Sequence, residues 1–159
     1  MGAGAYSPKT LTVCFLARAA YATGAHIRAR VWTFEDEPVE DDFFQKRIEA
    51  AISRRARLLP GGLPEAVRLV FGESDCLPGL TVDKYGAYTV CQFHTAGADR
   101  RRSVIVQALQ NRLGCKGIID RSDDGIRAQD GLPPSGGVLA GEPPSEPIEI
   151  REAECRYWV

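Results

Sequence analysis

The sequence predicts an α+β fold in which a mainly antiparallel sheet packs against two helices. Short apolar and β-branched runs recur between turn residues, as in Leu80–Tyr85 and Tyr88–Phe93, which the tight Gly86-Ala87 turn would join as a hairpin. Two longer segments, 43–59 and 99–113, carry apolar residues at helical spacing. Hydrophobic residues make up 44% of the 159 positions and charged residues 26%, which is enough apolar material for one core.

The first elements along the chain are predicted strands. Residues 11–16 are apolar and β-branched, and residues 27–32 alternate apolar with basic side chains. That alternation puts Ile27, Ala29 and Val31 on one face of a strand and Arg28 and Arg30 on the other.

An acidic linker, residues 35–42, precedes the first predicted helix. Asp41 or Asp42 is the expected N-cap, and Pro60-Gly61-Gly62 is the expected stop. The helix would bury one stripe of its surface against the sheet. The stripe comprises Phe44, Ile48, Ile52, Ala56 and Leu59.

Beyond this helix we expect strands at residues 67–71, 80–85, 88–93 and 118–119. Asp99 is the expected cap of the second helix and Gly114 its end. Residues 129–147 are rich in glycine and proline, which predicts a loop and a candidate domain boundary. Residues 148–151 and 155–159 would form a last hairpin.

Composition narrows the class of protein. Twenty basic and 21 acidic residues leave a net charge of −1, so any nucleic-acid binding must come from a local patch. The five cysteines lack metal-site spacing, and their odd number favours free thiols in a reducing cytosol. The longest early apolar run is too short to cross a bilayer. We therefore expect a cytoplasmic protein without a membrane segment.

Two turns gather carboxylates that could carry chemistry. If the strand ends lie side by side, their carboxylates could hold Mg²⁺ or divide acid and base roles, as in a small metal-dependent hydrolase. The structural alternative is that these side chains cap turns, or pair with Arg121. The residues concerned are Glu73, Asp75, Asp120, Asp123 and Asp124.

Basic residues form a second candidate set, for RNA. Arg28 and Arg30 lie close to Trp32 in one strand, and Arg100, Arg101 and Arg102 are consecutive near the second helix. Phosphates need basic side chains on one surface, and aromatic rings can stack on unpaired bases. The alternative is an ordinary solvated helix face.

Several segments resemble, in order and spacing, the bacterial ribosomal RNA cytosine-5 methyltransferase family of the large-subunit class I. The resemblance runs from about Phe15 to Val159. It is carried by residues 16–21, 27–33, Phe43-Phe44 with Arg47, 72–83, 95–98 and Asp120-Arg121-Ser122-Asp123, and by Gly141-Glu142 with Pro147-Ile148. Residues 1–15 depart from the family, whose Tyr-Ser-Pro turn is found here earlier, at Tyr6-Ser7-Pro8.

The resemblance implies three parts. Residues 1–36 would be part of an RNA-binding barrel of the PUA type, residues 37–147 the family's middle α+β domain, and residues 148–159 the start of a catalytic domain that binds S-adenosylmethionine. None of the cysteines matches the family's catalytic motif, so the sequence assigns no catalytic residue, no metal ligand and no cofactor contact to this chain. Arg28, Arg30 and Trp32 match the barrel's last strand.

We therefore expect a truncated ribosomal RNA cytosine-5 methyltransferase, inactive as this chain alone, with ribosomal RNA as its partner. A stand-alone RNA-binding module and the metal-dependent hydrolase are the alternatives. An incomplete barrel would leave an open sheet edge, so residues 1–36 are expected to be disordered or to pair in a homodimer.

Overall fold

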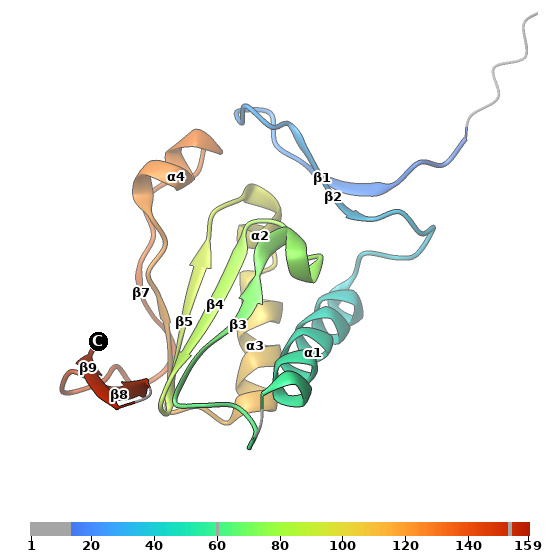
Figure 1. Ribbon diagram of the computed structural model, residues 1–159. Helices are drawn as coiled ribbons and strands as arrows, with labels where there is room; N and C mark the ends of the chain where they lie inside the picture. Colours follow the sequence, from blue (N-terminus) through green and yellow to red (C-terminus); the bar gives the residue numbers. More distant parts are fainter. Residues whose placement is uncertain (1–13, 60, 153) are drawn as a thin grey trace, which may run out of the picture.

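The computed structural model describes residues 14–59, 61–152 and 154–159. A five-stranded sheet forms the centre, and separate two-stranded hairpins precede and follow it (Figure 1). In chain order the elements are β1 (Arg18–Tyr21), β2 (Ala29–Thr33), α1 (Asp41–Leu58), β3 (Ala66–Phe71), the 3₁₀ turn η1 (Gly72–Asp75), β4 (Leu80–Tyr85), β5 (Tyr88–Phe93), α2 (Ala96–Arg100), α3 (Arg102–Leu113), β6 (Gly117–Asp120), α4 (Asp124–Gln129), β7 (Gly137–Gly141), β8 (Glu149–Glu152) and β9 (Cys155–Trp158).

The central sheet has the order β3-β4-β5-β6-β7. All neighbouring strands are antiparallel except β5 and β6, which run parallel because α2 and α3 cross over between them. Strands β4 and β5 form the predicted hairpin, with Tyr85 opposite Tyr88 across the turn. The α+β prediction with a mainly antiparallel sheet is confirmed, but the described residues contain four α-helices rather than two.

Helix α1 begins and ends close to its predicted limits. Its N-cap is Glu40, and Asp41 and Asp42 lie in the first turn, where negative charge interacts favourably with the helix dipole; the prediction of Asp41 or Asp42 as cap was wrong. Phe44, Ile48 and Ile52 are buried as predicted. Phe43 and Ala51 are buried as well, which widens the apolar stripe.

The second predicted helix is two helices. Thr95 caps α2 by accepting a hydrogen bond from the Ala98 backbone N–H, so the expectation that Asp99 is the cap was wrong. Asp99 lies inside α2 instead. Gly114 ends α3 as predicted, in a left-handed conformation (φ 56°) that glycine adopts without strain.

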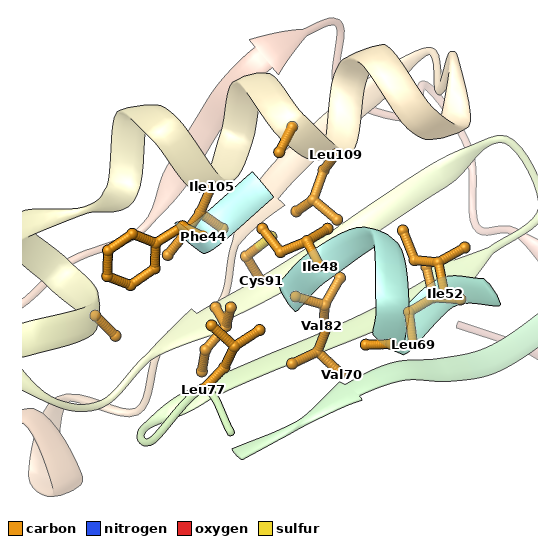
Figure 2. Close-up of a cluster of buried hydrophobic side chains, with 14 of the residues drawn as sticks. Phe44, Ile48, Ile52, Leu69, Val70, Leu77, Val82, Cys91, Ile105 and Leu109 are labelled. Carbon is orange, nitrogen blue, oxygen red and sulfur yellow. The ribbon is translucent and has the colours of Figure 1, made fainter. Parts of the chain in front are cut away.

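The core lies between one face of the sheet and the two long helices, α1 and α3 (Figure 2). In β5 the side chains of Thr89, Cys91 and Phe93 alternate with less buried neighbours, so this strand turns every second residue toward the helices. Each fully buried aliphatic or aromatic side chain contributes about 1.5–3 kcal/mol to stability. The residues labelled in Figure 2 are Phe44, Ile48, Ile52, Leu69, Val70, Leu77, Val82, Cys91, Ile105 and Leu109.

The glycine- and proline-rich segment 129–147 differs from the prediction of a loop. Within it β7 pairs with β6, with Gly137 opposite Asp120 and Gly141 opposite Gly117. A Cβ on Gly141 would lie 2.0 Å from the Lys116 carbonyl oxygen, so this close strand pairing requires glycine. The composition of this segment resembled that of a loop because glycine is also common in loops. Here glycine instead allows two strands to approach closely.

The two outer hairpins are β1–β2 and β8–β9, both antiparallel. The second confirms the last predicted hairpin. A strand was predicted at residues 11–16, but residues 14–16 are not in a strand and residues 11–13 lie outside the described part. Residues 14–36 contain one two-stranded hairpin. None of the helices in the described ranges combines the length with the apolar character needed to cross a membrane.

Candidate RNA-facing groove

The hairpin β1–β2 is anchored to the rest of the protein by Trp32. Its side chain is 6% exposed and packs edge-on against Phe44, with ring centroids 5.1 Å apart. Gly97 in α2 lets the hairpin approach, since a Cβ there would lie 2.5 Å from the Ala20 Cβ and 3.0 Å from the Trp32 ring. The hairpin therefore sits next to α2, as Figure 1 shows.

A groove of about 690 Å³ runs between β1 and α2, and we call it the α2 groove. Arg18, Arg100 and Arg101 supply its positive charge, and Tyr21, 58% exposed, supplies an aromatic ring. Basic side chains beside an exposed ring suit a backbone phosphate and an unstacked base. The groove is lined by residues 17–21, Thr23, Trp32, Val39, Phe44, Gly97, Arg100 and Arg101.

The six residues predicted to face RNA do not share one surface. Arg28 and Arg100 are exposed, and Arg100 lines the α2 groove. Trp32 was expected to be available to RNA, and its burial in the core contradicts that expectation. Arg30 lies on the other side of the hairpin, where its guanidinium is 3.6 Å from Glu73 and 3.8 Å from Asp130.

Arg101 has a structural role beside the groove. It forms an ion pair with Asp41 (3.3 Å), donates to the Val39 carbonyl oxygen (3.1 Å) and lies over the Phe44 ring. These contacts join α2 to the segment that leads into α1. Because its donors are largely committed, Arg101 contributes charge to the groove more than direct hydrogen bonds.

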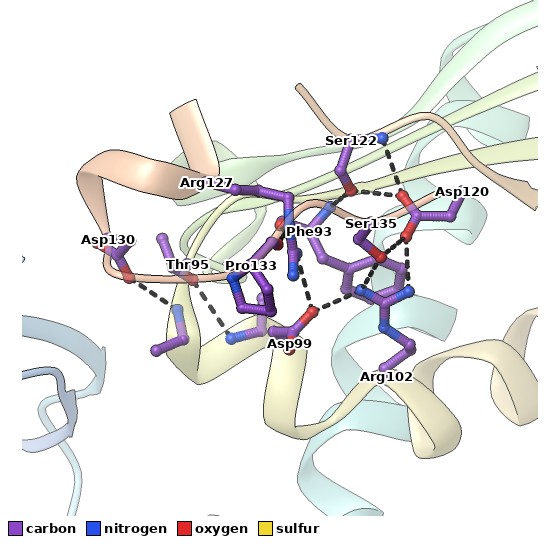
Figure 3. A network of polar contacts seen from close by, with 12 residues as sticks. Phe93, Thr95, Asp99, Arg102, Asp120, Ser122, Arg127, Asp130, Pro133 and Ser135 are labelled. Atoms are coloured by element: carbon purple, nitrogen blue, oxygen red, sulfur yellow. Dashed lines mark hydrogen bonds and ion pairs between the residues drawn. The ribbon is translucent and has the colours of Figure 1, made fainter. Parts of the chain in front are cut away.

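Arg102 belongs to a largely buried polar network, and its side chain is 24% exposed (Figure 3). Its guanidinium donates to Asp120 (2.6 Å), Asp99 (2.5 Å) and Ser135 (2.9 Å). Arg127, almost fully buried, also donates to Asp99 (2.9 Å). The network ties α2, α3, β6, α4 and the segment before β7 together, so the hydrogen bonds of Arg102 are committed within the protein. Contact of Arg102 with RNA stays a prediction.

The carboxylates of the two acidic turns are held apart by separate partners. Asp75 accepts from Arg54, Arg55 and the Phe71 backbone N–H. Asp123 instead caps α4 by accepting from the Ile126 N–H (2.8 Å), and Asp124 accepts from the Ser135 N–H (3.2 Å). Arg121 is exposed, and other arginines pair with these carboxylates: Arg54 and Arg55 with Asp75, and Arg102 with Asp120.

These partners explain why the pKa values of three acids, Asp75, Asp99 and Asp120, are lowered. Burial by itself raises the pKa of Asp75 and Asp99, but hydrogen bonds from arginines outweigh burial and hold the pKa of each below its ordinary value. The pKa of Asp120 is lowered in the same way, by Ser122, Ser135 and Arg102. Among the described residues, no three potential ligands gather in a way that could hold a metal ion. The carboxylates of the two turns therefore do not form, among the described residues, the cluster that the metal-dependent hydrolase would require.

S-adenosylmethionine does not fit the one β-α-β crossover in the described chain. In such units the backbone N–H groups at the start of the helix receive the nucleotide. Here Asp130 accepts from the Ala96 N–H (2.7 Å) and Thr95 accepts from the Ala98 N–H (3.3 Å). The donors that would cradle a cofactor are already occupied, so no cofactor chemistry is assigned to these residues.

Known proteins that resemble this chain are methyltransferases, although no family model matches it. It is 44% identical over 138 residues to ribosomal RNA large subunit methyltransferase I of Vibrio cholerae, which covers 87% of this chain and 35% of that protein. The proteins of the same description from Klebsiella pneumoniae and Aeromonas salmonicida are 42% and 43% identical over 146 residues, covering 91% of this chain and 36% and 37% of theirs.

Two solved structures share the fold. One is described as an S-adenosylmethionine-dependent methyltransferase from Streptococcus mutans (TM-score 0.73), and the other as a methyltransferase in complex with SAH (TM-score 0.74). Each is 18% identical and matches 90% of this chain and 36% of its own. The homologues of this chain are thus ribosomal RNA large subunit methyltransferases I, and the chain spans about a third of their length.

Proposed function

We propose that this chain is an RNA-binding region of a ribosomal RNA methyltransferase and that it holds ribosomal RNA in the α2 groove. The relatives' names supply the class of RNA, and the groove supplies a surface of suitable chemistry. The observation that carries the proposal is the placing of Arg18, Arg100 and exposed Tyr21 around one groove. Arg18 forms an ion pair with Asp36 (2.5 Å), and the neighbouring Arg101 and Arg102 are committed to structural contacts, so Arg100 is the groove arginine without an ion pair among the described residues.

The reaction of the whole protein is also a proposal. By the resemblance described above, it transfers a methyl group from S-adenosylmethionine to C5 of a cytosine in ribosomal RNA, in the cytoplasm. The residues of this chain would orient the RNA and leave the methyl transfer to residues outside the described fold. The barrel segment at 1–36, the middle domain at 37–147 and the catalytic start at 148–159 remain the proposed divisions.

Salt dependence tests the RNA-binding proposal. If the groove arginines Arg18, Arg100 and Arg101 each neutralise one phosphate, affinity for a single-stranded fragment should fall about 20-fold between 50 and 200 mM salt, since each contact contributes a slope of about −0.7. Fluorescence anisotropy with a labelled large-subunit ribosomal RNA fragment measures this. Arg100→Ala should reduce the slope by about 0.7.

Arg57→Ala is the matched control, because Arg57 is exposed in the last turn of α1, at the end of that helix remote from the groove. It should leave both affinity and slope unchanged. Equal losses for Arg57→Ala and Arg100→Ala would mean that attraction is diffuse and that the groove is not the site. Isothermal titration with S-adenosylmethionine should give no tight binding to this chain, and tight binding would contradict our assignment.

A further inference from the structure

A second, smaller cleft of about 280 Å³ lies on the other side of the hairpin, and we call it the α4 cleft. Four segments distant in sequence form it: the hairpin loop with β2, the η1 turn, the end of the sheet where β4 begins and β5 ends, and α4. It is lined by His26, Ile27, Arg30, Phe71, Gly72, Glu73, Ser74, Gly79, Thr81, His94, Thr95, Ile126, Gln129 and Asp130.

Two residues that line this cleft each carry a buried polar atom without a hydrogen-bond partner. Within the described ranges, three buried side-chain nitrogen or oxygen atoms make no hydrogen bond: Arg30 Nε, His94 Nε2 and Thr89 Oγ1. The first two both belong to residues of the α4 cleft. A buried polar group without a partner costs free energy, so two in one cleft point to a ligand that satisfies them.

The charges in the cleft argue against an anion. Arg30 is the only arginine or lysine in the lining, and Glu73 and Asp130 flank it at 3.6 and 3.8 Å. Burial lowers the pKa of His94, which favours its neutral form. One positive and two negative charges give the cleft a net negative charge, so a phosphate group would be repelled.

The remaining features suit a neutral, flat, polar ligand. Ile27, Phe71 and Ile126 present apolar surface to solvent at the cleft and are 55%, 53% and 44% exposed. Its volume is near the lower end for small-molecule sites, about 300 Å³. Proteins recognise single-stranded RNA by placing unstacked bases against aromatic and apolar side chains and hydrogen-bonding their edges.

We propose that the α4 cleft takes one unstacked nucleobase of RNA, with Arg30 donating to a ring or carbonyl acceptor of the base. Glu73 and Asp130 would accept from an exocyclic amino group, as acidic side chains do with cytosine. Uracil has no amino group, so the cleft favours cytosine, adenine or guanine. This inference rests on the proposed RNA binding but concerns base identity, which the α2 groove does not read.

Free nucleosides test the cleft without the RNA backbone. In ¹H–¹⁵N spectra of the chain, cytidine should shift the backbone signals of cleft residues and uridine should bind several-fold more weakly. In five-residue RNA, replacing the central uridine of an all-uridine strand with cytidine should then tighten binding about tenfold, as expected for one well-placed base.

Two substitutions test the lining with little risk to folding. Phe71 is half exposed, and the His94 ring nitrogen Nε2 makes no internal hydrogen bond, so Phe71→Leu and His94→Gln should unfold at the same temperature as the parent. Both should weaken cytidine binding and leave the salt slope unchanged. Arg57→Ala is again the control and should change neither quantity.

The outcomes separate this inference from the proposed function. Salt-dependent RNA binding with equal affinity for both bases, unaffected by Phe71→Leu and His94→Gln, overturns the inference and leaves the groove proposal standing. Cytidine shifts confined to the cleft, without salt-dependent RNA binding, support the base site and remove the groove. No response to nucleosides or RNA overturns both.

Discussion

Replacing Trp32 with alanine separates a packing role from contact with RNA. Trp32 is 6% exposed, and its ring meets Phe44 edge-on in the space that Gly97 leaves open. Truncating a buried tryptophan to alanine costs about 3–5 kcal/mol in the free energy of unfolding. Because a domain of this size has about 5–15 kcal/mol of stability in all, Trp32→Ala should bring the protein close to unfolding. Trp32→Phe keeps an aromatic ring against Phe44 and should cost far less.

Urea unfolding followed by far-ultraviolet circular dichroism measures this change. Tryptophan fluorescence is unsuitable because the variant's signal would come from Trp158 instead of Trp32. RNA affinity should be measured at urea concentrations where the variant remains folded, and it should match that of the parent protein. A loss of stability under about 0.5 kcal/mol, typical of a surface substitution, together with a tenfold loss of RNA affinity would refute the burial argument. Trp32 would then be the stacking residue that its strand position suggested.

Three further predictions concern the supports of the groove and the network. The free energy of unfolding should fall as the pH drops below about 4, because acids whose pKa is lower in the folded protein stabilise it only while ionised. Urea unfolding at a series of pH values measures this fall. Asp120→Asn should make the free energy of unfolding less dependent on pH if the network is the source. Gly97→Ala should cost about 1–3 kcal/mol, because its methyl group would displace Ala20 and the hairpin; an unchanged melting temperature would contradict the close approach. Leu16 and Phe34, which flank the β1–β2 hairpin, are 82% and 75% exposed, so light scattering should detect self-association. The double substitution Leu16→Ser and Phe34→Ser should reduce it, and a monomer at all concentrations would exclude it.

Local sequence predicted the elements whose burial follows a simple period. The stripe of Phe44, Ile48 and Ile52 specified α1, because residues three or four apart share one face of a helix. The alternation in Tyr88–Phe93 specified β5 in the same way. The family resemblance was also visible in the sequence, and the comparisons support it at the level of ribosomal RNA methyltransferases.

Local sequence did not predict α4 and β7. Helix α4 is one short piece, Asp124–Gln129, whose Arg127 is buried because distant carbonyl oxygens and Asp99 accept its hydrogen bonds. Strand β7 consists of residues that composition assigns to a loop, and it exists because β6 offers an edge to pair with. Both depend on partners far away in the chain, which no short window of sequence contains.

What the sequence by itself determined is the α+β class, the main core elements and the likeness to a methyltransferase family. Only the tertiary structure decided which polar residues are free to act. Arg100 ends α2, Arg101 lies between the two helices and Arg102 begins α3, so these consecutive residues reach a groove, a helix junction and a buried network. Residue type specifies charge and hydrogen-bonding capacity, but the partners that long-range folding brings within reach decide whether that capacity remains available for RNA.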